Sequence, residues 1–180
     1  MLFNTLIEWF TGSPYDHIGM VLRDPVYLNE KFKGLYVWES GLEYKPDIED
    51  NKIKLGVQIT PINEILNDNK GTAYIRKLIC DDDLYFSTFS PENIKEVHDI
   101  VHNKPYDINP VDWILAIFRT DLSPQKTDRF WCSALVGYIY TKLGILNKDT
   151  DWSILRPSDF SLESRDKFTK YCEGFKLDDK

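Results

Sequence analysis

Two side chains in this sequence have the types and settings needed for covalent catalysis by a thiol. Cys132 stands near the start of an apolar segment, residues 130–144, whose pattern predicts a buried helix ending at Gly144. A sulfur at a helix start lies near unpaired backbone N–H groups and the positive end of the helix dipole, which favour a thiolate. For a lone cysteine, a small buried residue is the commoner interpretation, so the prediction depends on a base. His17 is the best candidate for that base, because Gly19, two residues later, leaves room for another group to approach the backbone.

A histidine base needs a partner that holds its tautomer, and Glu39 could provide it. Glu39 ends the apolar stretch 36–38, and it would reach His17 if the segments that carry the two residues pair as strands. A solvated acid at a strand end is an equally good interpretation from the local pattern. The third member of the site is therefore the least secure.

Two other groups of polar residues could hold metal ions. His98 and His102 have i, i+4 spacing, but Asp99 stands where a zincin helix has its glutamate, so we interpret both histidines as surface residues. The acidic run 81–83 lacks the glycine and the closing glutamate of a calcium loop, and a solvated turn is favoured. The sequence predicts neither a metal nor an organic cofactor.

The elements that must position the thiol and the base follow from hydrophobic periodicity. Residues 18–22 and 35–39 are apolar runs rich in β-favouring types, and we predict that they form neighbouring strands. A further helix begins after Ser90, a hydroxyl N-cap followed by proline, and stops before Pro105. The remaining predicted elements are short: helices at 3–10, 62–66 and 111–118, a strand at 73–79, and a last element from residue 157.

Length and composition limit the classes of protein. The chain has 180 residues, of which 42% are apolar, and this suits a single domain over residues 1–180 with a peripheral tail at about 162–180. The net charge of −7 without a basic stretch argues against nucleic acid as a partner. Three cysteines far apart indicate reduced thiols rather than a disulfide framework.

The same sequence gives expectations about membranes and location. The longest apolar run, residues 113–118, is too short to cross a bilayer, although peripheral contact with a membrane stays open. The first ten residues lack the basic start and the cleavage site of a signal peptide, which favours a cytoplasmic protein. The oligomeric state is left open.

Three motifs together resemble a known family. Residues 6–21 are similar to its helix, Gly-Ser-x-x-x-His-x-Gly segment and strand, residues 37–40 to the segment that carries its acid, and residues 130–138 to its Phe-x-Cys-Ser-x-Leu-Val-x-Tyr helix. The family is that of the circularly permuted papain-like enzymes of the NlpC/P60 superfamily, which includes bacterial YiiX-like proteins and a poxvirus member. The order of histidine, acid and cysteine is the permuted order.

The resemblance implies a fold and an activity. The fold would be α+β, with an antiparallel sheet packed against the helix that carries Cys132. The activity would be that of a cysteine amidase or peptidase-like hydrolase with the triad Cys132, His17 and Glu39, acting on a peptide, isopeptide or lipid acyl substrate without a cofactor. A lipid-directed acyltransferase or phospholipase on the same triad, and a non-catalytic binding module, are the alternatives. The poxvirus member makes the host cytoplasm or a virion the expected location if the chain is viral.

Overall fold

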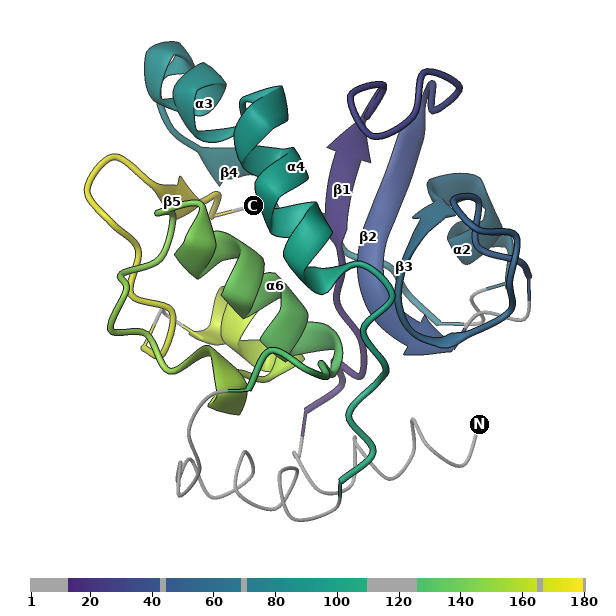
Figure 1. Cartoon of the computed structure of the whole chain (residues 1–180). Helices are drawn as coiled ribbons and strands as arrows, with labels where there is room; N and C mark the ends of the chain where they lie inside the picture. Colours follow the sequence, from purple (N-terminus) through teal and green to yellow (C-terminus); the bar gives the residue numbers. More distant parts are fainter. Residues whose placement is uncertain (1–12, 43–44, 69–70, 110–125, 165–166, 180) are drawn as a thin grey trace.

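The structure is a computed structural model, and it describes residues 13–42, 45–68, 71–109, 126–164 and 167–179 (Figure 1). The predicted helices at 3–10 and 111–118 lie outside these residues. Within the described ranges the protein is α+β, with two small antiparallel sheets and four α-helices. The predicted α+β class is therefore confirmed. No helix in the described part of the chain is long and apolar enough to span a membrane.

The larger sheet has the order β1-β2-β3, with β1 at Met20–Arg23, β2 at Leu35–Leu42 and β3 at Leu55–Pro61. Both pairings are antiparallel, which confirms the two neighbouring strands predicted from the apolar runs. Five successive residues of the central strand β2, residues 37–41, are buried. Successive strand residues point to opposite faces, so both faces of β2 are covered at this end of the sheet.

Two helices pack their apolar residues against this sheet. Helix α4, at Pro91–Val101, begins as predicted, because the Ser90 Oγ accepts a hydrogen bond of 3.2 Å from the backbone N–H of Asn93. Helix α6, at Cys132–Lys142, is buried over its first eight residues and is followed by Gly144 at φ 73°, the left-handed conformation that favours glycine. Both helices share one hydrophobic cluster with the strands, and its fully buried members are Trp38, Ile59, Val101, Phe130, Leu135, Ile139 and Leu146.

The remaining elements are short and lie around this core. They are the α-helices α2 at Ile62–Asp68 and α3 at Asp82–Thr88, and the 3-10 helices η1 at Trp152–Ile154, η2 at Pro157–Phe160 and η3 at Leu162–Ser164. The acidic run at 81–83 starts α3 instead of forming an isolated turn. The Asp81 carboxylate caps that helix by accepting a hydrogen bond of 2.8 Å from the Leu84 N–H.

The structure corrects two expectations about the smaller sheet and the chain end. The predicted strand at 73–79 is reduced to β4, Leu78–Ile79, because only these two residues have a partner strand, β5 at Lys176–Leu177. The expected peripheral tail is wrong for its second half, since Phe175 and Leu177 are 8% and 4% exposed. The tail is mostly polar, but these two apolar residues and the polar Thr169 are buried, and its backbone pairs with β4 through β5.

Candidate functional site

Cys132 is the first residue of α6, and only 4% of its surface is exposed. The N-cap residue, Trp131, makes no side-chain capping hydrogen bond, so the N–H groups of the first turn are not satisfied by a cap. The first turn is held in place by Ser133, whose Oγ donates a hydrogen bond of 2.7 Å to the Leu155 carbonyl. These N–H groups and the helix dipole favour negative charge near the Cys132 sulfur.

His17 and Glu39 are joined across the sheet. The Nε2 of His17 lies 2.7 Å from the Oε2 of Glu39. The β1-β2 register pairs Met20 with Trp38, and its continuation sets Gly19 opposite Glu39 and His17 opposite Gly41. The imidazole therefore reaches Glu39 diagonally on one face, over the space that Gly41 leaves: a Cβ added at Gly41 would be 3.4 Å from the His17 Cε1.

We expect Gly19→Ala to move His17 away from Glu39. A Cβ at this position would overlap Val37 Cγ1 and lie 3.2 Å from both the Glu39 Cβ and the Trp38 carbonyl, so the segment would have to shift away from β2. Overpacking of this kind costs about 1–3 kcal/mol. The melting temperature should fall, and the pKa of His17, measured by NMR titration, should move down toward 6.5. Gly34→Ala is a strain-only control, since Gly34 has φ 107° and open space around it. An unaltered pKa of His17 in a destabilised Gly19→Ala protein would show that the close approach at Gly19 does not position His17.

Glu39 is not a solvated strand end, because it is 1% exposed. Its Oε1 has no hydrogen-bond partner within the described residues, and the residue paired with it on β3 is the buried Gln58, whose Nε2 donates to the Gly41 carbonyl at 3.3 Å. A buried carboxylate is costly unless a cation or donors compensate it. Among the described residues, the His17 imidazole is the group in contact with this carboxylate, and the contact favours the charged imidazolium.

The electrostatic environment of His17 also includes Cys132. Burial lowers the pKa of the imidazole, but hydrogen bonds to Cys132 and Glu39 and the charges of both residues outweigh it and hold that pKa well above 6.5. Burial is the largest single influence, but the four favourable contributions of the two partners together exceed it, and 39% of the His17 side chain stays exposed. The same exposure leaves the ring accessible to a substrate.

Tyr106 is a residue of the site that the sequence analysis missed. Burial, the charge of Cys132 and the charge of Asp107 raise the pKa of its phenol, so Tyr106 stays protonated and can donate a hydrogen bond. A bridge between Tyr106 and Phe130 brings it beside the residues that lead into α6. No periodicity or motif marks this tyrosine, so only its position in space could have identified it.

The structure thus brings together His17, Glu39 and Cys132, which stand in distant parts of the sequence. It corrects the interpretation of His98 as a surface residue, since this histidine is 8% exposed. The three cysteines are all free, as the sequence predicts.

The comparisons with known proteins give no relative. No model of a protein family, no curated protein and no solved structure matches the chain significantly.

Proposed function

We propose that this protein is a thiol hydrolase that cleaves an amide, isopeptide or ester bond through an acyl-thioester on Cys132. The observation that carries the proposal is that one imidazole, His17, interacts both with a thiol at a helix start and with a buried carboxylate. This is the arrangement of nucleophile, base and orienting acid that covalent catalysis needs. A core cysteine or a simple ion pair would not require all three groups to meet.

The chemistry follows from these contacts. Because Nε2 of His17 is held by Glu39, Nδ1 is the nitrogen available to take the thiol proton. The Cys132 thiolate attacks the carbonyl carbon, the C–S bond forms, and the carbonyl electrons move to oxygen. His17 then gives its proton to the leaving nitrogen or oxygen, the carbonyl re-forms, and the C–N or C–O bond breaks to leave the acyl-thioester. Water attacks the thioester carbon and gives a proton to His17. The carbonyl re-forms again, the C–S bond breaks, the carboxylic acid leaves, and the proton on His17 restores the thiol.

Two sets of donors support the negative oxygen of the intermediate. The N–H groups at the uncapped start of α6 are close to the Cys132 sulfur, and the Tyr106 hydroxyl stays protonated near it. Glu39 keeps His17 in one tautomer and stabilises the imidazolium.

The proposed fold is the circularly permuted papain-like fold of the NlpC/P60 superfamily. Its support is the chain order of His17, Glu39 and Cys132, together with an antiparallel sheet and a buried helix that begins at the cysteine. A single domain, a cytoplasmic location and a viral source belong to the same proposal.

Cys132 should be the fastest of the three thiols to react with iodoacetamide between mildly acidic and neutral pH. His17 is hydrogen-bonded to its sulfur and can take its proton, whereas burial and the charges of Asp81 and Asp82 raise the pKa of the Cys80 thiol. Peptide mapping of the alkylated folded protein measures the rates at each site. His17→Ala should slow alkylation at Cys132 and leave the rate at Cys172 unchanged. Equal rates at Cys132 and Cys80 would contradict the proposed nucleophile.

The acyl group of the substrate is the open part of the proposal. A lipid-directed acyltransferase or phospholipase on the same triad is the second candidate, since aromatic residues near Cys132 could line an acyl pocket. Of those aromatics, Trp113 and Phe118 lie outside the described residues and Phe130 is 0% exposed within the core, so core packing accounts for Phe130. Phe130 is therefore not a residue of such a pocket.

A side-by-side profile separates these substrate classes. Acyl esters of graded chain length and a peptide library are offered to the protein, with Cys132→Ala as the matched control for turnover without the thiol. Preference for peptides supports a peptidase or amidase, and preference for long acyl chains supports the lipid alternative. A binding module of the same fold would show Cys132-independent binding and no turnover in either set.

A further inference from the structure

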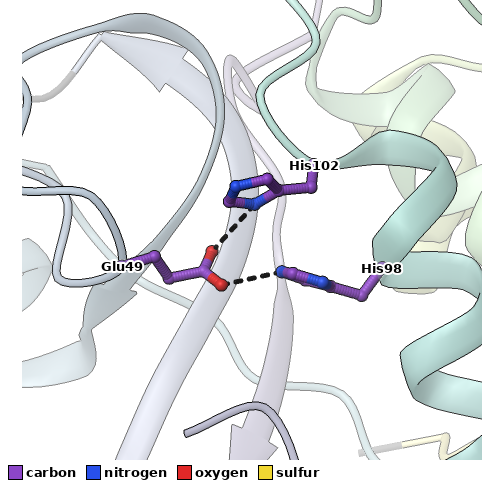
Figure 2. Close-up of side chains that lie close together, drawn as sticks. All are labelled: Glu49, His98 and His102. Carbon is purple, nitrogen blue, oxygen red and sulfur yellow. Dashed lines mark ion pairs between the residues drawn. The ribbon is translucent and has the colours of Figure 1, made fainter.

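A second cluster of ionisable side chains lies on α4 and on the loop between β2 and β3. Glu49, from that loop, reaches between His98 of α4 and His102, the residue that directly follows α4 (Figure 2). Its Oε1 is 2.8 Å from the Nε2 of His98, and its Oε2 is 3.4 Å from the Nδ1 of His102. One ligand atom from each of the three residues lies within 4.8 Å of the others. The i, i+4 spacing puts both imidazoles on one face of the helix.

His98 is the member that an ordinary ion pair explains least well. It is 8% exposed, and neither of its ring nitrogens makes a hydrogen bond of acceptable geometry with the described residues, despite the short contact to Glu49. Buried polar atoms are nearly always hydrogen-bonded or bound to an ion. The unsatisfied Nε2 of His98 faces the Glu49 carboxylate. A metal ion between the two groups would give this nitrogen a bonding partner.

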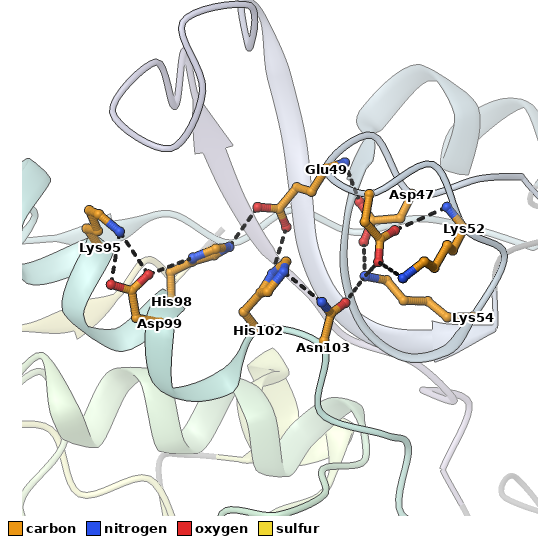
Figure 3. A network of polar contacts seen from close by, with 10 residues as sticks. Asp47, Glu49, Lys52, Lys54, Lys95, His98, Asp99, His102 and Asn103 are labelled. Atoms are coloured by element: carbon orange, nitrogen blue, oxygen red, sulfur yellow. Dashed lines mark hydrogen bonds and ion pairs between the residues drawn. The ribbon is translucent and has the colours of Figure 1, made fainter.

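An outer layer of polar residues surrounds the same cluster (Figure 3). Asp99 lies 3.6 Å from the Nδ1 of His98, and Lys95 holds its carboxylate with two contacts of 2.9 Å. The Asn103 amide lies 2.8 Å from the Nε2 of His102. Partners of this kind orient metal-bound histidines through the nitrogen that does not bind the metal.

Loading of a metal has one consequence for Asn103. A metal on the Nδ1 of His102 leaves the proton on Nε2, so Asn103 must turn its oxygen toward the ring. In the structure, the Lys54 Nζ donates to the Asn103 Oδ1 at 2.5 Å. The ammonium group can give up this hydrogen bond, because it also contacts the carboxylates of Asp47 and Asp50 at 2.5 Å and 3.4 Å.

We propose that Glu49, His98 and His102 form a binding site for one divalent transition-metal ion, with Zn²⁺ as the best match. Two imidazoles and a carboxylate are ligands that Zn²⁺ prefers, and water would take the fourth position. Bonds of about 2.0–2.1 Å at tetrahedral angles hold ligand atoms about 3.3 Å apart, so small rotations of the three side chains suffice. The ion would tie the β2-β3 loop to α4. The proposal does not depend on the thiol chemistry, because it uses none of its residues.

Zn²⁺ binding is measured by competition with a chromophoric chelator. The host is the full-length Cys132→Ala protein, stripped of metal, so that a thiolate at the other site does not bind the ion. We expect one equivalent of Zn²⁺ to bind, and the melting temperature to rise by about 5–10 °C at a free concentration near one hundred times Kd. Visible absorption of bound Co²⁺ reports a tetrahedral site with nitrogen and oxygen ligands.

Variants identify the ligands. Glu49→Gln should weaken Zn²⁺ binding at least about 100-fold, since outer partners alone are worth about 10–100-fold. Glu96→Gln, the same change at an exposed position of α4, should leave the affinity unaltered. His102→Gln is a second ligand variant at a more exposed residue, and circular dichroism checks that each variant is folded. An absence of Zn²⁺ binding, or an affinity unaltered in both Glu49→Gln and His102→Gln, would overturn the proposed site and leave an ion-pair cluster.

Discussion

Cys132→Ala protein is expected to lose covalent turnover completely. The acyl group has no other place to attach, because the proposed thioester forms on this sulfur and His17 alone cannot replace it. We expect the loss to exceed about 10³-fold against any substrate found in the profile, with no mass increase when an activated ester is added. Intact-mass spectrometry and a turnover assay measure the two effects.

Cys172→Ala is the matched control, because it removes a free thiol that is not part of the proposed triad. It should keep both the mass increase and the turnover. Since Cys132 is small and buried in the first turn of α6, alanine leaves little space and the melting temperature should change only slightly. Turnover that survives Cys132→Ala would remove the proposed mechanism, whatever the substrate.

The second large effect is expected for Glu39→Gln. Glutamine keeps the shape and can still hydrogen-bond to Nε2 of His17, but it removes the charge that stabilises the imidazolium. Turnover should fall by about 10²–10⁴-fold, while the melting temperature, measured above the raised pKa of His17 where the ion pair is absent from both proteins, stays nearly unchanged. Glu96→Gln on α4 controls for loss of one negative charge. Unaltered acylation of Cys132 by an activated ester in the Glu39→Gln protein would leave a Cys-His dyad.

The pH dependence of this variant gives an independent readout. Glu39 is one of the groups that hold the pKa of His17 above 6.5, so the active imidazolium of the unmodified protein persists at neutral pH and is lost as the pH rises through the raised pKa. In the Glu39→Gln protein, turnover should begin to decline at a lower pH on the alkaline side of its pH profile. The sign for stability is the same: stabilisation by the ion pair is complete below about 6.5 and disappears as the pH rises through the raised value.

The double variant tests whether the residues act as one unit. Groups that form a single catalytic unit have strongly non-additive effects. Glu39→Gln combined with Cys132→Ala should therefore match Cys132→Ala alone in turnover. A further loss in the double variant would indicate that Glu39 acts in a separate way.

Local patterns in the sequence carry much of the fold. The two β-favouring runs, the Ser90 cap with its following proline, and the apolar helix ending at Gly144 all predict elements that the structure contains. These patterns work because they reflect contacts between residues close in sequence. They fail where the partner is distant: residues 73–77 have β-favouring types without a partner strand, and the polar chain end is held by β4.

For the candidate site, the residue types with suitable chemistry and their order can be read directly from the sequence. The position of Cys132 at a helix start is also predictable, since it depends on neighbouring residues. The burial of Glu39 and its contact with His17, the place of Tyr106 near the thiol, and the contacts of Glu49 with His98 and His102 become visible in the folded chain. The physical reason is that burial and pairing of charges depend on strand register and on packing of segments far apart in the chain, which residue types and periodicity do not encode.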